Sequence, residues 1–186
     1  MIIIIEGRPG SGKTTCCKHL MEILKKDKNL HFCGFYTSEM RNASGERIGF
    51  EIITTSGERA ILADVREFSP YQIGKYFVRV ENIEKIVVPI LSKFIDEDFN
   101  ILIIDEVGKM EMLSSKFKEL LGTIINKNPG TIICTMPPVD FDVMLSLIRR
   151  KANKIFKLET QRKNALQIAE QIYRVIKEDL PSTGEY

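Results

Sequence analysis

The chain has no tryptophan, only two histidines, and no pair of cysteines spaced as CxxC. Neither His19 nor His31 has the spacing of a metal ligand or of a catalytic triad, so we expect structural roles for both. The four cysteines are Cys16, Cys17, Cys33 and Cys134. Without a zinc or disulfide pattern, they are expected to be buried apolar side chains in a reducing, cytoplasmic compartment.

The sequence also lacks long apolar runs and an excess of charge of either sign. No apolar stretch reaches the roughly 18 residues that a membrane-spanning helix needs, and residues 1–5 carry no basic leader. Lys and Arg total 27 against 25 Asp and Glu, which gives a net charge of +2. This balance does not indicate nucleic acid as a partner, although a local basic patch stays open. We expect a soluble monomer without a membrane partner.

The apolar segments that are present predict an α/β fold. Runs rich in β-branched residues occur at 2–5, 101–104 and 131–134, with a weaker alternating one at 154–158. Amphipathic helical patterns lie between them, at 13–26, 83–94, 117–124 and 165–176. Continuous apolar strands are typical of a parallel sheet covered by helices on both faces. At 186 residues the chain suits one domain, which we place at residues 1–180, followed by a flexible tail at 181–186.

Residues 32–63 depart from this alternation. Three extended stretches, 32–40, 47–54 and 58–63, are joined by turns rich in Asn, Ser and Gly. Such turns between β-prone stretches favour antiparallel hairpins. We therefore expect an inserted antiparallel meander that extends one edge of the parallel sheet. Residues 64–80 are aromatic and poorly periodic, and their pattern predicts no particular element.

The first apolar strand leads into the most specific motif of the chain. It reads Gly7-Arg8-Pro9-Gly10-Ser11-Gly12-Lys13-Thr14 and matches the P-loop pattern GxxxxGK[ST] in full. Inward-facing amides of such a loop, together with the helix N-terminus, bind a polyphosphate. Lys13 is expected to reach the β and γ phosphates, and the Thr14 hydroxyl to coordinate Mg²⁺. The motif predicts a nucleoside triphosphate as ligand.

The strand at 101–104 ends in two acids, Asp105 and Glu106, the pattern of a Walker B element. We expect Asp105 to hold Mg²⁺ directly or through water, and Glu106 to orient or deprotonate a water molecule. Thr135 ends the next core strand and is equally compatible with sensing the γ phosphate and with an ordinary strand end. The P-loop and this acidic pair together predict Mg²⁺-dependent phosphoryl chemistry.

Cations that could stabilise transition-state charge are Arg8, Lys109, Arg149, Arg150 and Arg162. Arg8 and Lys109 rank highest because their neighbours lie beside the expected phosphates, which makes Lys109 a catalytic candidate with Lys13 and Glu106. The string at 126–129 resembles the guanine-reading NKxD motif, but it ends in Pro129 and precedes a strand where that motif would follow one. Selectivity for GTP over ATP is therefore not predicted.

Three segments resemble the small P-loop nucleoside-triphosphatase family, which has thermophilic and human cancer-related members. They are residues 7–15, residues 34–41 continuing to 47–52, and Asp105-Glu106-Val107-Gly108-Lys109-Met110-Glu111. The resemblance implies Mg²⁺-dependent hydrolysis of ATP, GTP and other nucleoside triphosphates with broad base specificity. It also implies that the nucleotide site includes Thr15 and the segment Ile101, Leu102, Ile103, Ile104, Asp105, Glu106, Val107 and Gly108. Residues 161–163 match the family only in part, so a role for Arg162 is not carried over.

Two other functions would use the same phosphate-binding loop. A small-molecule kinase would replace water with an acceptor, and the basic run at 149–151 is the lid segment that this alternative would use. A nucleotide-switched binding module would instead present a surface such as the aromatic residues between Phe68 and Phe77. Phosphate release without an added acceptor favours hydrolysis over the kinase. A switch requires different partner affinities with triphosphate and diphosphate, and it can coexist with slow hydrolysis.

Overall fold

The computed structural model describes residues 1–97, 99–159 and 164–179. Within these ranges one sheet has the strand order β5-β6-β4-β3-β2-β7-β8-β1-β9. The strands are β1 (Ile2–Gly7), β2 (Phe32–Arg41), β3 (Arg47–Thr54), β4 (Arg59–Asp64), β5 (Gln72–Ile73), β6 (Tyr76–Val78), β7 (Ile101–Ile104), β8 (Thr131–Met136) and β9 (Lys154–Leu158). The helices are α1 (Lys13–Leu24), α2 (Val80–Asn82), η1 (Ile83–Val87), α3 (Val88–Asp96), η2 (Glu111–Leu113), α4 (Ser115–Lys127), α5 (Val143–Lys151) and α6 (Ala165–Asp179).

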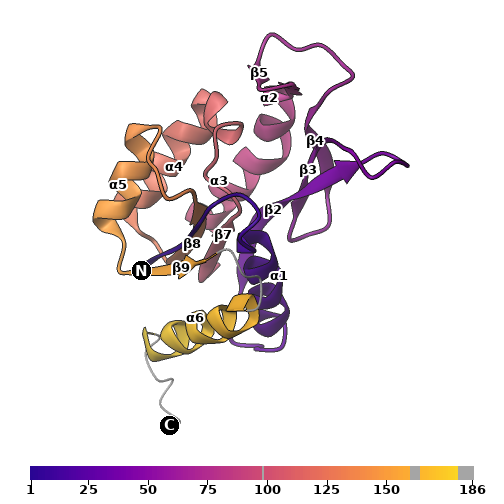
Figure 1. Cartoon of the computed structure of the whole chain (residues 1–186). Coiled ribbons are helices and arrows are strands. Elements are labelled where there is room, and N and C mark those ends of the chain that lie inside the picture. Colours follow the sequence, from indigo (N-terminus) through magenta and orange to yellow (C-terminus); the bar gives the residue numbers. More distant parts are fainter. Residues whose placement is uncertain (98, 160–163, 180–186) are drawn as a thin grey trace.

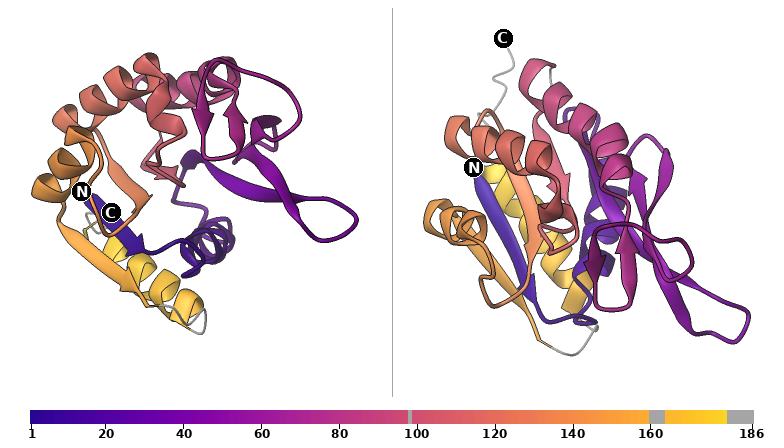
Figure 2. Two further views of the ribbon diagram at one scale, coloured as in Figure 1. Left: turned by 45° about the horizontal axis from the view of Figure 1, so that its top comes forward. Right: turned by 90° about the horizontal axis from the view of Figure 1, so that it is seen from above.

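The parallel half of the sheet carries both predicted motifs. β1 pairs with β8 and β9, and β7 pairs with β2 and β8, all in parallel. Helices α1 and α6 cover one face, and α3, α4 and α5 cover the other (Figure 1, Figure 2). In β1, Ile3 and Ile5 pack in the core beneath α1 and α6, whereas Ile2 and Ile4 pack in the opposite core. Burial on both faces explains the uninterrupted apolar runs, and the expected α/β fold is confirmed.

The antiparallel half begins in β2, which belongs to both parts of the sheet. Phe32 to Phe35 pair in parallel with β7, and the strand then continues as the partner of β3, which pairs in turn with β4. The three strands of this meander lie within one or two residues of the expected stretches. Figure 2 shows the β2–β3 hairpin projecting away from the parallel sheet. The short hairpin β5–β6 extends the same edge through β4 and lies in the segment for which the sequence predicted no element.

The helices differ from expectation in three places. The predicted helix at 83–94 is part of a longer helical run formed by α2, η1 and α3, and α1 ends at Leu24, two residues early. Helix α5 was not predicted; the Asp142 carboxylate caps it by accepting a 2.9 Å hydrogen bond from the Met144 amide. The tail prediction for 181–186 lies outside the described residues. None of the helices in the described ranges combines the length and apolarity needed to cross a bilayer.

Candidate active site

The P-loop connects β1 to α1 through two glycines with positive φ. Gly10 has φ 79° and Gly12 has φ 99°, values that an L side chain rarely adopts. Gly12 is the N-cap residue of α1 and has no side chain with which to cap it. The amides of the first helical turn are therefore free to bind an anion, where the helix dipole adds favourable charge.

Lys13 lies between the loop and the end of β7. Its side chain is 8% exposed, and Nζ donates a 2.8 Å hydrogen bond to the Gly7 carbonyl and a 3.3 Å one to the Arg8 carbonyl. The same nitrogen is 3.6 Å from Oε2 of Glu106. The fold thus brings together two predicted residues that are 93 positions apart in the numbering, the phosphate-binding cation and the candidate base.

Asp105 is fully buried at the end of β7, and only one of its carboxylate oxygens is occupied by a strong hydrogen bond. Oδ1 accepts a 2.6 Å hydrogen bond from the Thr135 hydroxyl, while Oδ2 has no hydrogen-bond partner among the described residues. Burial raises the pKa of Asp105, whereas Thr135, the Thr14 hydroxyl and the Lys13 charge oppose this rise. A buried carboxylate oxygen left open beside a threonine hydroxyl fits a hard cation such as Mg²⁺.

The described residues contain no cluster of three His, Cys, Asp or Glu side chains that would hold a metal by itself. Mg²⁺ is commonly bound by one or two protein oxygens, with substrate phosphates and water as the remaining ligands. Asp105 and Thr14 supply such a pair, so their chemistry fits the predicted ion.

Glu106 borders the site from the segment after β7. Its side chain is 37% exposed. Partial burial and the neighbouring Asp105 raise the pKa of Glu106, and the Lys13 ammonium opposes them. A carboxylate whose pKa is raised is a stronger base toward water than an ordinary surface acid. The position and the environment both suit the predicted role in activating water.

A second acid, Glu111, lies close to Glu106 and was given no role by the sequence patterns. A Cβ atom added to Gly108 would lie 2.6 Å from Oε2 of Glu111 and 3.0 Å from Oε1 of Glu106, so both carboxyl groups approach this one glycine. Glu111 is 2% exposed, and burial followed by the charge of Glu106 raises its pKa to about 8. No sequence pattern marks this position, because Glu111 reaches Glu106 only through the turn at Gly108 and the 3-10 helix η2 that follows it.

The meander supplies the wall opposite the P-loop, a contribution that the sequence did not predict. A cavity of about 490 Å³ lies between the two. Its lining includes Gly10, Gly12, Lys13, Thr14, Thr15 and Lys18 on one side, and Thr37, Ser38, Glu39, Arg47 and Phe50 on the other. This phosphate cavity, as we name it, is the candidate position for a triphosphate.

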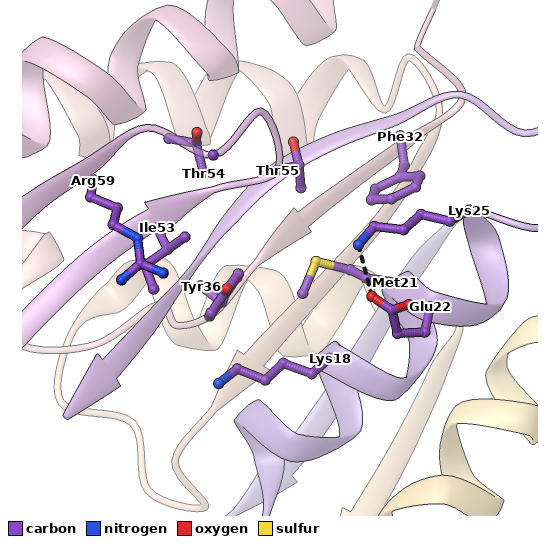
Figure 3. A pocket seen from close by; sticks show the side chains of 11 residues that line it. Lys18, Met21, Glu22, Lys25, Phe32, Tyr36, Ile53, Thr54, Thr55 and Arg59 are labelled. Carbon is purple, nitrogen blue, oxygen red and sulfur yellow. Dashed lines mark hydrogen bonds and ion pairs between the residues drawn. The ribbon is translucent and has the colours of Figure 1, made fainter.

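A neighbouring groove of about 390 Å³ runs between α1 and the meander, and Figure 3 shows the side chains that line it. Its cations are already engaged. Lys25 pairs with Glu22 at 2.7 Å, Arg59 pairs with Glu51 at 3.0 Å, and Lys18 lies 5.0 Å from the centre of the Tyr36 ring. The phosphate cavity also contains the uncapped N-terminus of α1, whose amides can bind an anion, so it is the stronger anion site of the two.

The candidate cations have different surroundings. Lys109 is exposed, with Nζ 5.8 Å from the centre of the Phe141 ring, and Arg8 is exposed on the P-loop, so a role for either toward phosphate stays a prediction. Arg149 is instead held in place by three partners. It forms an ion pair with Glu6, donates a 2.6 Å hydrogen bond to Asp140, and donates another hydrogen bond to the Pro137 carbonyl. We assign Arg149 to fixing the loop after β8. Arg162 lies outside the described residues.

The remaining predicted site residues support the site from the core. Ile101, Leu102, Ile103, Ile104 and Val107 are all 0% exposed. They pack in the two hydrophobic cores and hold Asp105 in position, so we do not assign them direct contact with a nucleotide. The Val107 amide donates a 3.1 Å hydrogen bond to the Thr135 carbonyl, which ties the acidic segment to β8.

Comparisons with known proteins show the family and the fold of the chain. A family model described as NTPase matches residues 2–173. The chain is 40% identical to nucleoside-triphosphatase THEP1 of Thermotoga maritima over 166 residues, covering 89% of this chain and 91% of the relative. It is 33% identical to the human cancer-related nucleoside-triphosphatase over 176 residues, covering 88% and 91%. The crystal structure of THEP1 from Aquifex aeolicus superposes with a TM-score of 0.82 at 35% identity, covering 95% of this chain and 99% of that one.

Proposed function

The chain belongs to the NTPase family whose model it matches, and we propose that it hydrolyses Mg²⁺-bound nucleoside triphosphates between its P-loop and the end of β7. It is a nucleoside-triphosphatase, a hydrolase that yields nucleoside diphosphate and phosphate. The observation that supports the proposed position best is the 3.6 Å separation of Lys13 Nζ and Glu106 Oε2. It places a cation suited to the γ phosphate beside a base suited to water.

In this proposal the P-loop binds the phosphates through charge and geometry. Backbone N–H groups of Gly10, Gly12, Lys13 and Thr14, at the N-terminus of α1, would bind the β and γ phosphates, whereas the Ser11 amide already donates a 3.1 Å hydrogen bond to the Arg8 carbonyl. When the nucleotide binds, Lys13 replaces its hydrogen bonds to the Gly7 and Arg8 carbonyls by hydrogen bonds to phosphate oxygens. Since Lys13 is already buried at the loop, little side-chain entropy is lost in this exchange.

Thr14 and Asp105 would hold Mg²⁺, which when bound neutralises charge on the β and γ phosphates. Thr135 fixes the Asp105 carboxylate through Oδ1, and Oδ2, which has no hydrogen-bond partner among the described residues, would be available to hold the ion. Thr135 is thus a positioning residue in this proposal, a role that differs from both interpretations left open by the sequence.

Glu106 orients the attacking water and accepts its proton. The new bond forms between the water oxygen and the γ phosphorus, and the bond from that phosphorus to the β–γ bridging oxygen breaks. The diphosphate leaves with the electron pair, and Lys13 stabilises its charge. Phosphoryl transfer of this kind depends mainly on positioning and electrostatics, which these residues supply.

We also propose broad base specificity with both ATP and GTP as substrates, a monomeric state, and a cytoplasmic location. Support for the location comes from the four cysteines, which all lie in the described ranges as buried free thiols. Cys16, Cys33 and Cys134 have pKa values raised by burial to about 12, so they stay protonated and inert at neutral pH.

The experiment is a turnover panel with ATP, GTP, CTP and UTP, each with Mg²⁺ and with excess chelator. The proposal predicts phosphate release from all four nucleotides with Mg²⁺ and its loss with chelator. Release from a single nucleotide would contradict broad specificity, and release that persists in chelator would contradict the ion's role at Asp105 and Thr14.

A further inference from the structure

A second cavity opens next to the phosphate cavity, with Glu106 on the border of both. Its volume is about 540 Å³, within the range of small-molecule binding sites. The apolar part of its wall consists of Phe50, Leu62, Ile73, Met110, Val139 and Phe141. These side chains come from the meander, from the β5–β6 hairpin, from the segment after β7 and from the loop after β8, so the cavity lies where four parts of the chain meet.

The apolar wall is not needed for hydrolysis. A water molecule requires room beside Glu106 and polar partners, not a cavity of this size walled by aliphatic and aromatic groups. Val139 is nevertheless 72% exposed and Phe141 is 37% exposed at the rim of this cavity. Apolar side chains that are left in contact with solvent around a concave site are typical of ligand pockets.

The polar end of the cavity coincides with the chemistry of the phosphate site. Arg8, Glu106, Lys109 and Glu111 all line it. The Lys109 ammonium lies 5.8 Å from the centre of the Phe141 ring, which places a cation beside an aromatic wall. A molecule in the cavity would therefore have its apolar part against the rings and its polar end at Glu106, beside the γ phosphate.

We propose that this cavity binds a small ring-bearing alcohol and presents its hydroxyl to the γ phosphate as a phosphoryl acceptor. The inference rests on the proposed function, because it uses the same nucleotide position and the same base. The acceptor oxygen forms a bond to the γ phosphorus while the bond to the β–γ bridging oxygen breaks. The hydroxyl proton passes to the Glu106 carboxylate, and the nucleoside diphosphate leaves with the electron pair. The products are a phosphate monoester and the diphosphate, and no further reactant is needed.

The test uses the full chain with Mg²⁺-ATP and three probes of increasing reach: benzyl alcohol, phenylethanol and phenylpropanol. Phosphorus NMR separates inorganic phosphate from a phosphate monoester, and methionine-methyl NMR reports binding through Met110. The Met110 signal is assigned with Met110→Leu, and Met21, which lines the α1 groove, is the internal reference. We expect at least one probe to shift the Met110 methyl selectively and to yield its monoester.

Two exposed valines provide a matched pair of variants. Val139 lines the cavity, whereas Val143, at the start of α5 and 83% exposed, does not. In Val139→Glu, a carboxylate in the apolar wall should lower the ratio of monoester to inorganic phosphate about tenfold or more relative to Val143→Glu. An equal ratio in the two variants would overturn the location.

The wild-type result separates this inference from the proposed function. Phosphate release without monoester from any probe overturns the acceptor site and leaves hydrolysis in place, as does a Met110 shift without monoester. Absence of both products overturns the proposed function and the acceptor site together.

Discussion

The Thr135 hydroxyl donates a 2.6 Å hydrogen bond to Oδ1 of Asp105 and thereby joins the ends of β8 and β7 at the proposed Mg²⁺ position. Both side chains are buried, at 0% and 1% exposure. The sheet order explains the contact, since β8 lies between β7 and the P-loop strand β1. A side chain at the end of β8 therefore lies between the two motifs.

Replacing Thr135 by valine keeps the shape of the side chain and removes this hydrogen bond. Asp105 then loses the group that fixes its orientation, so the Mg²⁺ concentration for half-maximal turnover should rise about tenfold, as is typical for partners of metal ligands. A Mg²⁺ titration of phosphate release measures this shift. Thr131→Val, at the opposite end of β8, is the control and should not change the Mg²⁺ concentration for half-maximal turnover. An unchanged titration in Thr135→Val would remove Thr135 from the metal site.

The buried acid Glu111 should make the stability of the protein depend on pH. Its folded pKa is raised to about 8 from the ordinary 4.5, so the fold prefers the neutral form. Its contribution to stability is fully present below about pH 4.5 and is lost as pH rises through about 8. Glu111→Gln stays neutral throughout. The free energy of unfolding of this variant, relative to wild type, should rise by about 1 kcal/mol or more between about pH 5 and pH 8.

Chemical denaturation across this pH window measures the difference. Glu119→Gln, at an exposed acid on α4, is the control for replacing a glutamate by glutamine. A difference between Glu111→Gln and wild type that does not change with pH would mean that Glu111 is ionised in the folded protein at neutral pH.

Arg149 should matter for stability more than for catalysis. It joins Glu6 on β1 to Asp140 and the Pro137 carbonyl, and its side chain is 20% exposed. Arg149→Met leaves these partners partly buried without their cation, and we expect a loss of about 2 kcal/mol in unfolding free energy. The folded variant should keep a kcat within about threefold of wild type, since surface and structural arginines do not stabilise the transition state.

Arg150→Met is the matched control because Arg150 is the adjacent exposed arginine of α5. It should change neither stability nor turnover. A hundredfold fall in kcat for Arg149→Met at unchanged stability would instead identify an arginine finger.

The motifs that could be predicted from the sequence are those whose parts are contiguous. The P-loop and the Asp105-Glu106 pair each follow an apolar strand, and in a parallel sheet the ends of such strands meet at one edge. Their mutual approach through Lys13 and Glu106 therefore followed from the fold class. The three meander strands were also predictable, because Asn-, Ser- and Gly-rich turns separate them.

Other features depend on contacts that no local pattern encodes. The hairpin β5–β6 has strands of two and three residues and exists through its pairing with β4. Helix α5 has nine residues, too few for its apolar spacing to stand out, and it follows two prolines. Glu111 reads as an ordinary polar residue until the turn at Gly108 brings it to Glu106. The apolar cavity arises from four separate segments and has no signature in any one of them.

The most direct test of the account is the rate of phosphate release by Glu106→Gln at saturating Mg²⁺-ATP and Mg²⁺-GTP, with nucleotide affinity measured in parallel. Glutamine preserves the shape of the side chain and cannot accept the proton of water. The account predicts a fall in kcat of about a hundredfold with affinity close to that of wild type and of Glu119→Gln. Undiminished turnover in Glu106→Gln would contradict the assignment of Glu106 as the base beside Lys13.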